Sequence, residues 1–124
     1  MLNKSGIVKT DYAEFKQILA DPSLQFSVGC LVSSDIGNTK AGTPIFVDLS
    51  NINVACKKVD NTATFANAVL LHDVDVSNGQ TNGTALIFGF VDLNKVDTTT
   101  RKLLKTALST DGATKLITLV NYNG

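Results

Sequence analysis

Residues 68–93 carry the strongest structural signal in the sequence, AVLLHDVDVSNGQTNGTALIFGFVDL. Residues 68–76 are rich in Val and Leu, the polar stretch 77–83 contains two Asn-Gly pairs, and residues 84–93 form a second apolar run. Because Asn and Gly adopt positive φ at low cost, Asn-Gly between two apolar runs predicts a β-hairpin. Both faces of the second run are apolar, so we expect it to be a central strand that is covered on both sides.

Two other segments have the periodicity of short amphipathic helices. In residues 11–20, apolar side chains recur at helical spacing, and Asp11 with Glu14 fits a capping box, so we expect a helix capped by Asp11. It should end before Pro22, because the residue that precedes a proline avoids the helical region. Residues 98–108 form the second predicted helix. Its predicted cap is Asp97 or Thr98, and its apolar stripe consists of Leu103, Leu104, Ala107 and Leu108.

Four further segments have the pattern of strands, namely residues 24–33, 45–49, 54–59 and 115–120. In the first of them Leu24, Phe26, Val28 and Cys30 alternate with polar or small residues, which predicts one covered face. We find no pattern of a parallel βαβ repeat. About six strands and two short helices predict a mainly β (α+β) fold, a small β-barrel or β-tulip-like domain with one N-terminal and one C-terminal helix. We expect a single domain over residues 11–124, preceded by an N-terminal arm over residues 1–10.

The charge balance argues against nucleic acid as a partner, and the distribution of apolar residues argues against a membrane. The 124 residues contain 11 Lys plus Arg and 11 Asp plus Glu, so the chain lacks the basic surface that nucleic-acid binding requires. We interpret Arg101, Lys102 and Lys105 as the solvated side of the second helix. No apolar run approaches the roughly 18 residues that span a bilayer. The start of the chain, MLNKSGIVKTDYAEF, lacks the apolar core of a signal peptide, so we expect no membrane partner and synthesis in the cytoplasm.

The chain contains two cysteines, Cys30 and Cys56, and each has apolar or small neighbours. In a protein made in the cytoplasm this pattern favours two buried thiols over a disulfide. A zinc site needs about four ligands, which two cysteines and one histidine do not supply. We therefore predict no metal and no cofactor. Phe88 and Phe90 have no basic neighbours, so we interpret them as core residues and not as a platform for stacked bases.

The one cluster that suggests chemistry is His72-Asp73-Val74-Asp75. On a strand, Asp73 and Asp75 would share a face, where two carboxylates could hold Ca²⁺ or Mg²⁺. His72 could act as a general base, but the segment contains no serine or cysteine nucleophile. We favour the interpretation that these are exposed strand residues that discourage edge pairing and hold the loop. We therefore predict no catalytic residue.

Residues 68–76 and 85–91, AVLLHDVDV and ALIFGFV on either side of a Gly-containing loop, resemble small head proteins of tailed bacteriophages, the head fiber and capsid decoration proteins. The preceding segment KAGTPI at residues 40–45 is also similar to that group. The order of the last predicted helix and strand is similar to the lambda-type decoration protein, so the resemblance covers residues 40–120. Ala68 departs from the pattern, which has glycine at this position.

The resemblance implies a non-enzymatic capsid decoration (cement) protein, a homotrimer on the outer surface of the virion that binds the major capsid protein and stabilises the shell. It also implies an N-terminal arm that adds to a sheet edge of the shell protein. Alternatives are the base domain of a head fiber that engages a host surface, and a small β-barrel ligand-binding or enzyme domain that uses His72, Asp73 and Asp75. The expected capsid-binding residues are Leu2, Ile7, Val8, Lys9 and Tyr12.

Overall fold

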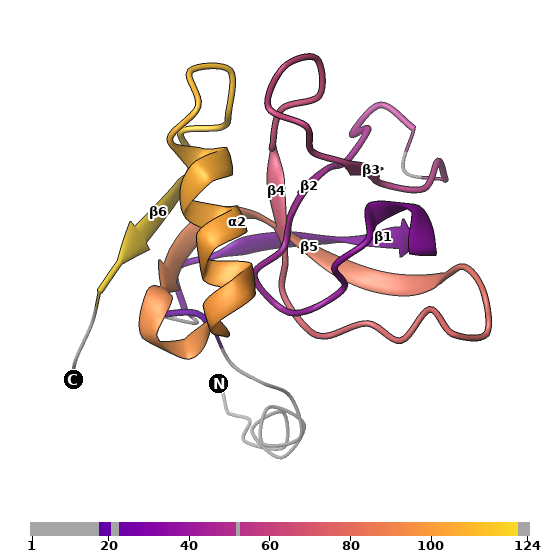
Figure 1. Cartoon of the computed structure of the whole chain (residues 1–124), viewed down its shortest axis with the longest axis horizontal. Helices are drawn as coiled ribbons and strands as arrows, with labels where there is room; N and C mark the ends of the chain where they lie inside the picture. The colour runs from indigo at the N-terminus through magenta and orange to yellow at the C-terminus, as the bar shows by residue number, and fades with distance from the viewer. Residues whose placement is uncertain (1–17, 21–22, 52, 122–124) are drawn as a thin grey trace.

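The structure, a computed structural model, describes residues 18–20, 23–51 and 53–121. These residues form one mixed sheet with a single α-helix packed against it (Figure 1). The strands are β1 (Phe26–Val32), β2 (Pro44–Phe46), β3 (Lys57–Lys58), β4 (Ala68–Leu70), β5 (Thr81–Asp92) and β6 (Ile117–Val120). The helix is α2 (Thr98–Leu108), and two 3-10 turns are η1 (Ser34–Ile36) and η2 (Leu93–Lys95).

The sheet is open, and the predicted barrel is therefore wrong. The strands follow the order β1-β5-β4-β2-β3, with β6 paired to the end of β5. The two outer strands, β1 and β3, share no hydrogen-bond ladder in this order. They approach each other through the Cys56 N–H, which donates to the Leu31 carbonyl at 2.9 Å. This hydrogen bond holds the two ends of the sheet near each other but does not close the sheet into a barrel. The fold is therefore α+β with a strongly curved sheet.

The predicted hairpin exists, but its first strand and its loop differ from the prediction. β4 and β5 pair antiparallel, with Val69 opposite Leu86. β4 ends at Leu70, and residues 71–80 form the connection. Of the two Asn-Gly pairs, only the first lies in a turn, at Gly79 with φ of +107°, because the second lies within β5.

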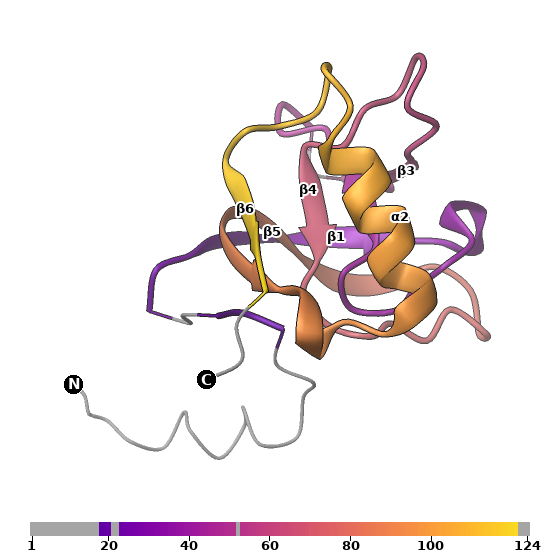
Figure 2. The ribbon, with the colours of Figure 1, turned by 60° about the vertical axis from the view of Figure 1, so that its left-hand side comes forward.

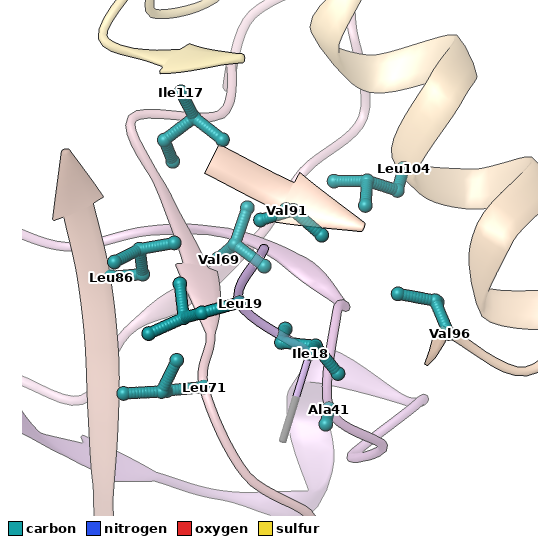
Figure 3. Packing of buried hydrophobic residues seen from close by; sticks show 10 residues of the cluster. All are labelled: Ile18, Leu19, Ala41, Val69, Leu71, Leu86, Val91, Val96, Leu104 and Ile117. Atoms are coloured by element: carbon teal, nitrogen blue, oxygen red, sulfur yellow. The ribbon is translucent and has the colours of Figure 1, made fainter. Parts of the chain in front are cut away.

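β5 is the central strand, as predicted, and it supplies both hydrophobic clusters. It pairs with β1, β4 and β6. Since successive side chains of a strand point to opposite faces, Leu86 joins one cluster while Ala85 and Ile87 join the other. Figure 3 shows the first cluster, in which Leu86 lies near Leu19 and near Val69 of β4. Its buried members are Ile18, Leu19, Ala41, Val69, Leu71, Leu86, Val91, Val96, Leu104 and Ile117.

The helix α2 has the predicted bounds, and Asp97 is its N-cap. The Asp97 carboxylate accepts a hydrogen bond from the Thr100 N–H at 2.8 Å. Leu104 and Ala107 are buried, whereas Leu103 from the predicted stripe is exposed. The helix connects β5 to β6, which pair in parallel, so the chain contains one β-helix-β crossover that the sequence pattern did not predict.

The prediction of an N-terminal helix over residues 11–20 is wrong at the C-terminal end of that segment. Leu19 forms an antiparallel bridge with Val91, so residues 18–20 are extended against β5. The rest of that helix, including its predicted cap Asp11, lies outside the described residues. The N-terminal arm also lies outside them. The four strands outside the hairpin, β1, β2, β3 and β6, are shorter than predicted. In β1, Phe26 is exposed, although the alternation predicted a covered face.

Candidate interaction surface

The cluster at residues 72–75 lies outside the strands, and its carboxylates hold two loops. Asp73 accepts a hydrogen bond of 2.7 Å from the Ala41 N–H. Asp75 accepts one of 2.9 Å from the Ser77 N–H. Two hydrogen bonds from Ser77 lower the pKa of Asp75, the larger effect from its hydroxyl and the smaller from its N–H. The prediction that Asp73 and Asp75 hold the loop is confirmed. The prediction of a strand that puts both carboxylates on one face is wrong.

The described residues offer little else with the character of a reaction centre. Across residues 18–20, 23–51 and 53–121, no group of three or more His, Cys, Asp or Glu side chains could hold a metal ion. A surface hollow of about 490 Å³ is lined by one charged residue, Lys57, among small, polar and aromatic neighbours, so it pairs no acid with a base. In this part of the chain no helix is long and apolar enough to cross a membrane.

The three basic residues of α2 lie in different environments. The Arg101 guanidinium donates a hydrogen bond of 3.0 Å to the Val96 carbonyl and is half-buried. Lys102 and Lys105 are exposed, as expected for the solvated side of the helix. A single pair of exposed lysines does not form a phosphate-binding surface of useful extent.

Four exposed apolar side chains come from backbone segments that meet at Gly89, and we call them the apolar patch: Leu24, Phe26, Phe88 and Leu116. Their exposed fractions are 53, 58, 43 and 52%. Phe26 and Phe88 are cross-strand partners in the β1–β5 pair. The Leu116 carbonyl accepts a hydrogen bond from the Gly89 N–H, and the Leu24 carbonyl lies 3.5 Å from where a Cβ on Gly89 would be. Exposed apolar side chains on backbone segments this close together mark a candidate contact site.

The patch arises because the strand alternation breaks. Ser27 pairs with Leu86 but Phe26 pairs with Phe88, which leaves Ile87 with no partner on β1. Such a bulge re-aims the side chains that follow it. Leu86 stays in the core while Phe88, two residues later, is exposed. The prediction that Phe88 is a core residue is therefore wrong. In the sequence, the one indication of an irregular strand at this point is Gly89, which follows Phe88.

The strand beside the patch, β1, is an uncharged sheet edge. It is the first strand in the sheet order, and residues 23–34 contain no charged side chain. Natural edge strands are usually protected against pairing by charge, by proline or by short length. β1 is seven residues long and has neither charge nor proline. This composition favours contact with another polypeptide.

The N-terminal part of the chain joins the domain at the same end of β5. The Ala20 N–H donates to the Phe90 carbonyl, and the Asp92 N–H donates to the Ile18 carbonyl, both at 2.8 Å. Residues 18–20 therefore lie beside the part of β5 that follows the patch residue Phe88 (Figure 2). The predicted capsid-binding residues precede this point and lie outside the described residues; they are Leu2, Ile7, Val8, Lys9 and Tyr12.

Comparison with known proteins adds no relative. No protein-family model matches the chain, and no curated protein matches it. The resemblance of residues 40–120 to phage head proteins therefore rests on the sequence pattern itself.

Proposed function

We propose that this protein is a capsid decoration (cement) protein of a tailed bacteriophage. It binds the outer surface of the major capsid shell as a homotrimer and stabilises the shell. The observation that carries this function is the apolar patch, a group of exposed apolar side chains that lies where residues 18–20 enter the domain. The resemblance of residues 40–120 to phage head proteins supplies the partner.

The position of the patch supports contact with the shell. Residues that precede Ile18 include the predicted capsid-binding segment, and the chain reaches the domain beside Phe90, two residues from Phe88. A strand-adding arm and an apolar patch at one end of the domain would engage the same surface together. Main-chain hydrogen bonds from the arm would give affinity, and the patch would give a desolvated centre to the contact.

Stabilisation follows from linkage. A protein that binds the expanded shell and not its open or dissociated forms lowers the free energy of the expanded shell by mass action. A trimer that holds three contacts at once adds avidity, since the second and third contacts form at high effective concentration. This role requires no catalytic group, which agrees with the use of Asp73 and Asp75 to hold loops.

Co-sedimentation tests this function. Purified protein is mixed with expanded capsids that lack it, from the phage that encodes the chain, and bound protein is measured in the pellet. We expect saturable binding for the wild type and at least a tenfold loss of affinity for the double variant Phe26→Ser/Phe88→Ser, because central aromatic contacts dominate interface energies.

A matched control separates the patch from general apolar surface. Leu103→Ser changes a side chain on α2 that is 43% exposed, the same fraction as Phe88, but lies outside the patch. This variant should sediment like the wild type. Absence of saturable binding by the wild type would refute the function, and equal losses in both variants would refute the assignment of the patch. Light scattering on the free protein should give three times the monomer mass, and a monomer at all concentrations would refute the trimer.

A further inference from the structure

The two cysteines of the chain meet at the open side of the sheet. Cys30 lies in β1, and Cys56 directly precedes β3, the strand at the other end of the sheet order. Both side chains are buried in one hydrophobic cluster, with exposed fractions of 5 and 4%. The Cys56 N–H donates to the carbonyl of Leu31, the neighbour of Cys30, at 2.9 Å, so the two backbones are already joined at this point. Both thiols are free.

Cys30 is the more acidic of the two thiols. A hydrogen bond from the Cys56 side chain lowers the pKa of Cys30. The same hydrogen bond, together with burial, raises the pKa of Cys56. Both side chains belong to one buried cluster, and the bond from the Cys56 N–H to the Leu31 carbonyl places their backbone segments side by side. Since the thiolate is the nucleophile, Cys30 would react first with an oxidant.

A small oxidant has a route to Cys30. A surface hollow of about 220 Å³ is lined by Gly29, Cys30, Leu31, Asn53, Asn82 and Gly83. Gly83 lies opposite Cys30 across the β1–β5 pair, and a Cβ at that position would be 3.7 Å from the Cys30 Sγ. Cys30 therefore borders a surface hollow through which a small oxidant can approach.

We propose that Cys30 and Cys56 are a redox-sensitive pair that a peroxide converts into an intramolecular disulfide across the open side of the sheet. The Cys30 thiolate attacks one peroxide oxygen, the O–O bond breaks, and the leaving hydroxide takes a proton to become water. The resulting Cys30 sulfenic acid is then attacked by Cys56. The S–S bond forms, the S–O bond breaks, and the sulfenic hydroxyl leaves with the Cys56 proton as a second water. Overall, two thiols are oxidised by two electrons and one peroxide is reduced to two waters.

The disulfide would join β1 covalently to the segment that leads into β3. In the reduced protein this junction is held by non-covalent contacts, which include the backbone hydrogen bond from Cys56 to Leu31. The protein is expected to be made in a reducing cytoplasm, where thiols persist, and a disulfide would form after exposure to an oxidising exterior. The reduced chain could therefore fold first and be locked afterwards.

Hydrogen peroxide titration of the folded full-length protein, read by intact mass and peptide mapping, tests the proposal. We expect a loss of about 2 Da per chain, the two thiol hydrogens. One cross-linked peptide pair should contain Cys30 and Cys56, and dithiothreitol should reverse the change. The thermal unfolding midpoint of the oxidised protein should rise by several degrees, because the cross-link restricts the unfolded chain.

The order of events is tested with single variants. In Cys56→Ser, dimedone should label Cys30 as a sulfenic acid, because no resolving thiol is present. Three results would overturn the proposal: a wild type whose mass only gains oxygen atoms, a wild type that forms only intermolecular dimers, or one that stays unmodified at peroxide excess. The wild-type mass measurement decides the matter even if a variant fails to fold. Capsids take no part in it, so its outcome is independent of the proposed function.

Discussion

Replacement of Gly42 by alanine should be among the most damaging single changes in the described fold. Gly42 has φ of +99°, a conformation that costs a non-glycine residue about 1–2 kcal/mol. Its new Cβ would also lie 2.8 Å from Val96 Cγ1 and 3.3 Å from Thr100 Cγ2. Both neighbours are buried, so they have little room to move, and overpacking of this kind costs roughly 1–3 kcal/mol. We expect a total loss of about 2–5 kcal/mol, the sum of the two costs.

Three other glycines separate the two causes. Gly79 has φ of +107° with no atom near its Cβ position, so Gly79→Ala should cost only the backbone strain, about 1–2 kcal/mol. Gly83 is outside the positive-φ set, but its Cβ would be 2.9 Å from Val32 Cγ2, so Gly83→Ala should cost only the crowding, about 1–3 kcal/mol. Gly29 has neither problem, and Gly29→Ala should stay within about 0.5 kcal/mol of the wild type.

Urea denaturation at pH 7, followed by circular dichroism, measures all four variants. The free energies of unfolding are comparable if the m-value stays constant across the set. The reasoning requires Gly42→Ala to lose more stability than either Gly79→Ala or Gly83→Ala. It is refuted if Gly79→Ala or Gly83→Ala loses as much stability as Gly42→Ala, or if Gly29→Ala is as destabilising as Gly83→Ala.

Two further predictions concern single carboxylates. Asp97→Ala should destabilise the protein by about 1 kcal/mol because α2 loses its N-cap, whereas Asp97→Ser should retain most of that stability; equal losses in urea titrations would contradict the capping role. Hydrogen bonds from the Thr64, Thr62 and Ala63 N–H groups hold the pKa of Asp60 well below its usual range. The carboxylate therefore stabilises the fold fully above its unfolded pKa of about 3.9, and loses that effect as the pH falls toward its folded pKa. The stability difference between the wild type and Asp60→Ala should be constant from about pH 5 to pH 8 and shrink below about pH 4, and an unchanged difference at about pH 2 would contradict the assignment.

Elements that depend on neighbouring residues were predictable from the sequence. The cap residue Asp97 and the helical spacing of Leu104 and Ala107 lie within one stretch of 11 residues, and α2 has the predicted bounds. The pairing of β4 with β5 also follows from a local apolar pattern around a turn at Gly79.

Features that depend on distant partners were not predictable. The Leu71 N–H still donates to the Thr84 carbonyl of β5, but the Val74 N–H donates to the Thr39 carbonyl, 35 positions earlier in the chain. The spacing of Ile18 and Leu19 fits a helix, but these residues are buried against β5 in an extended form. In both cases tertiary contacts override local propensity.

The candidate surface was missed for the same reason. Phe26 and Phe88 read as core residues because they are aromatic and lie in apolar strands. The bulge between β1 and β5 exposes them, and a bulge is a property of the pairing register of two strands that are far apart in the sequence. The uncharged edge at residues 23–34 was visible in the sequence, but its place at the end of the sheet was not.

The most direct test of the central claim is a reconstruction by electron cryomicroscopy of expanded capsids incubated with the purified protein. We predict added density on the outer surface of the shell, with three copies of the domain around each binding position and with Phe26 and Phe88 against the major capsid protein. Capsids that carry no added density at saturating protein, or density from which the apolar patch faces the solvent, would contradict the account.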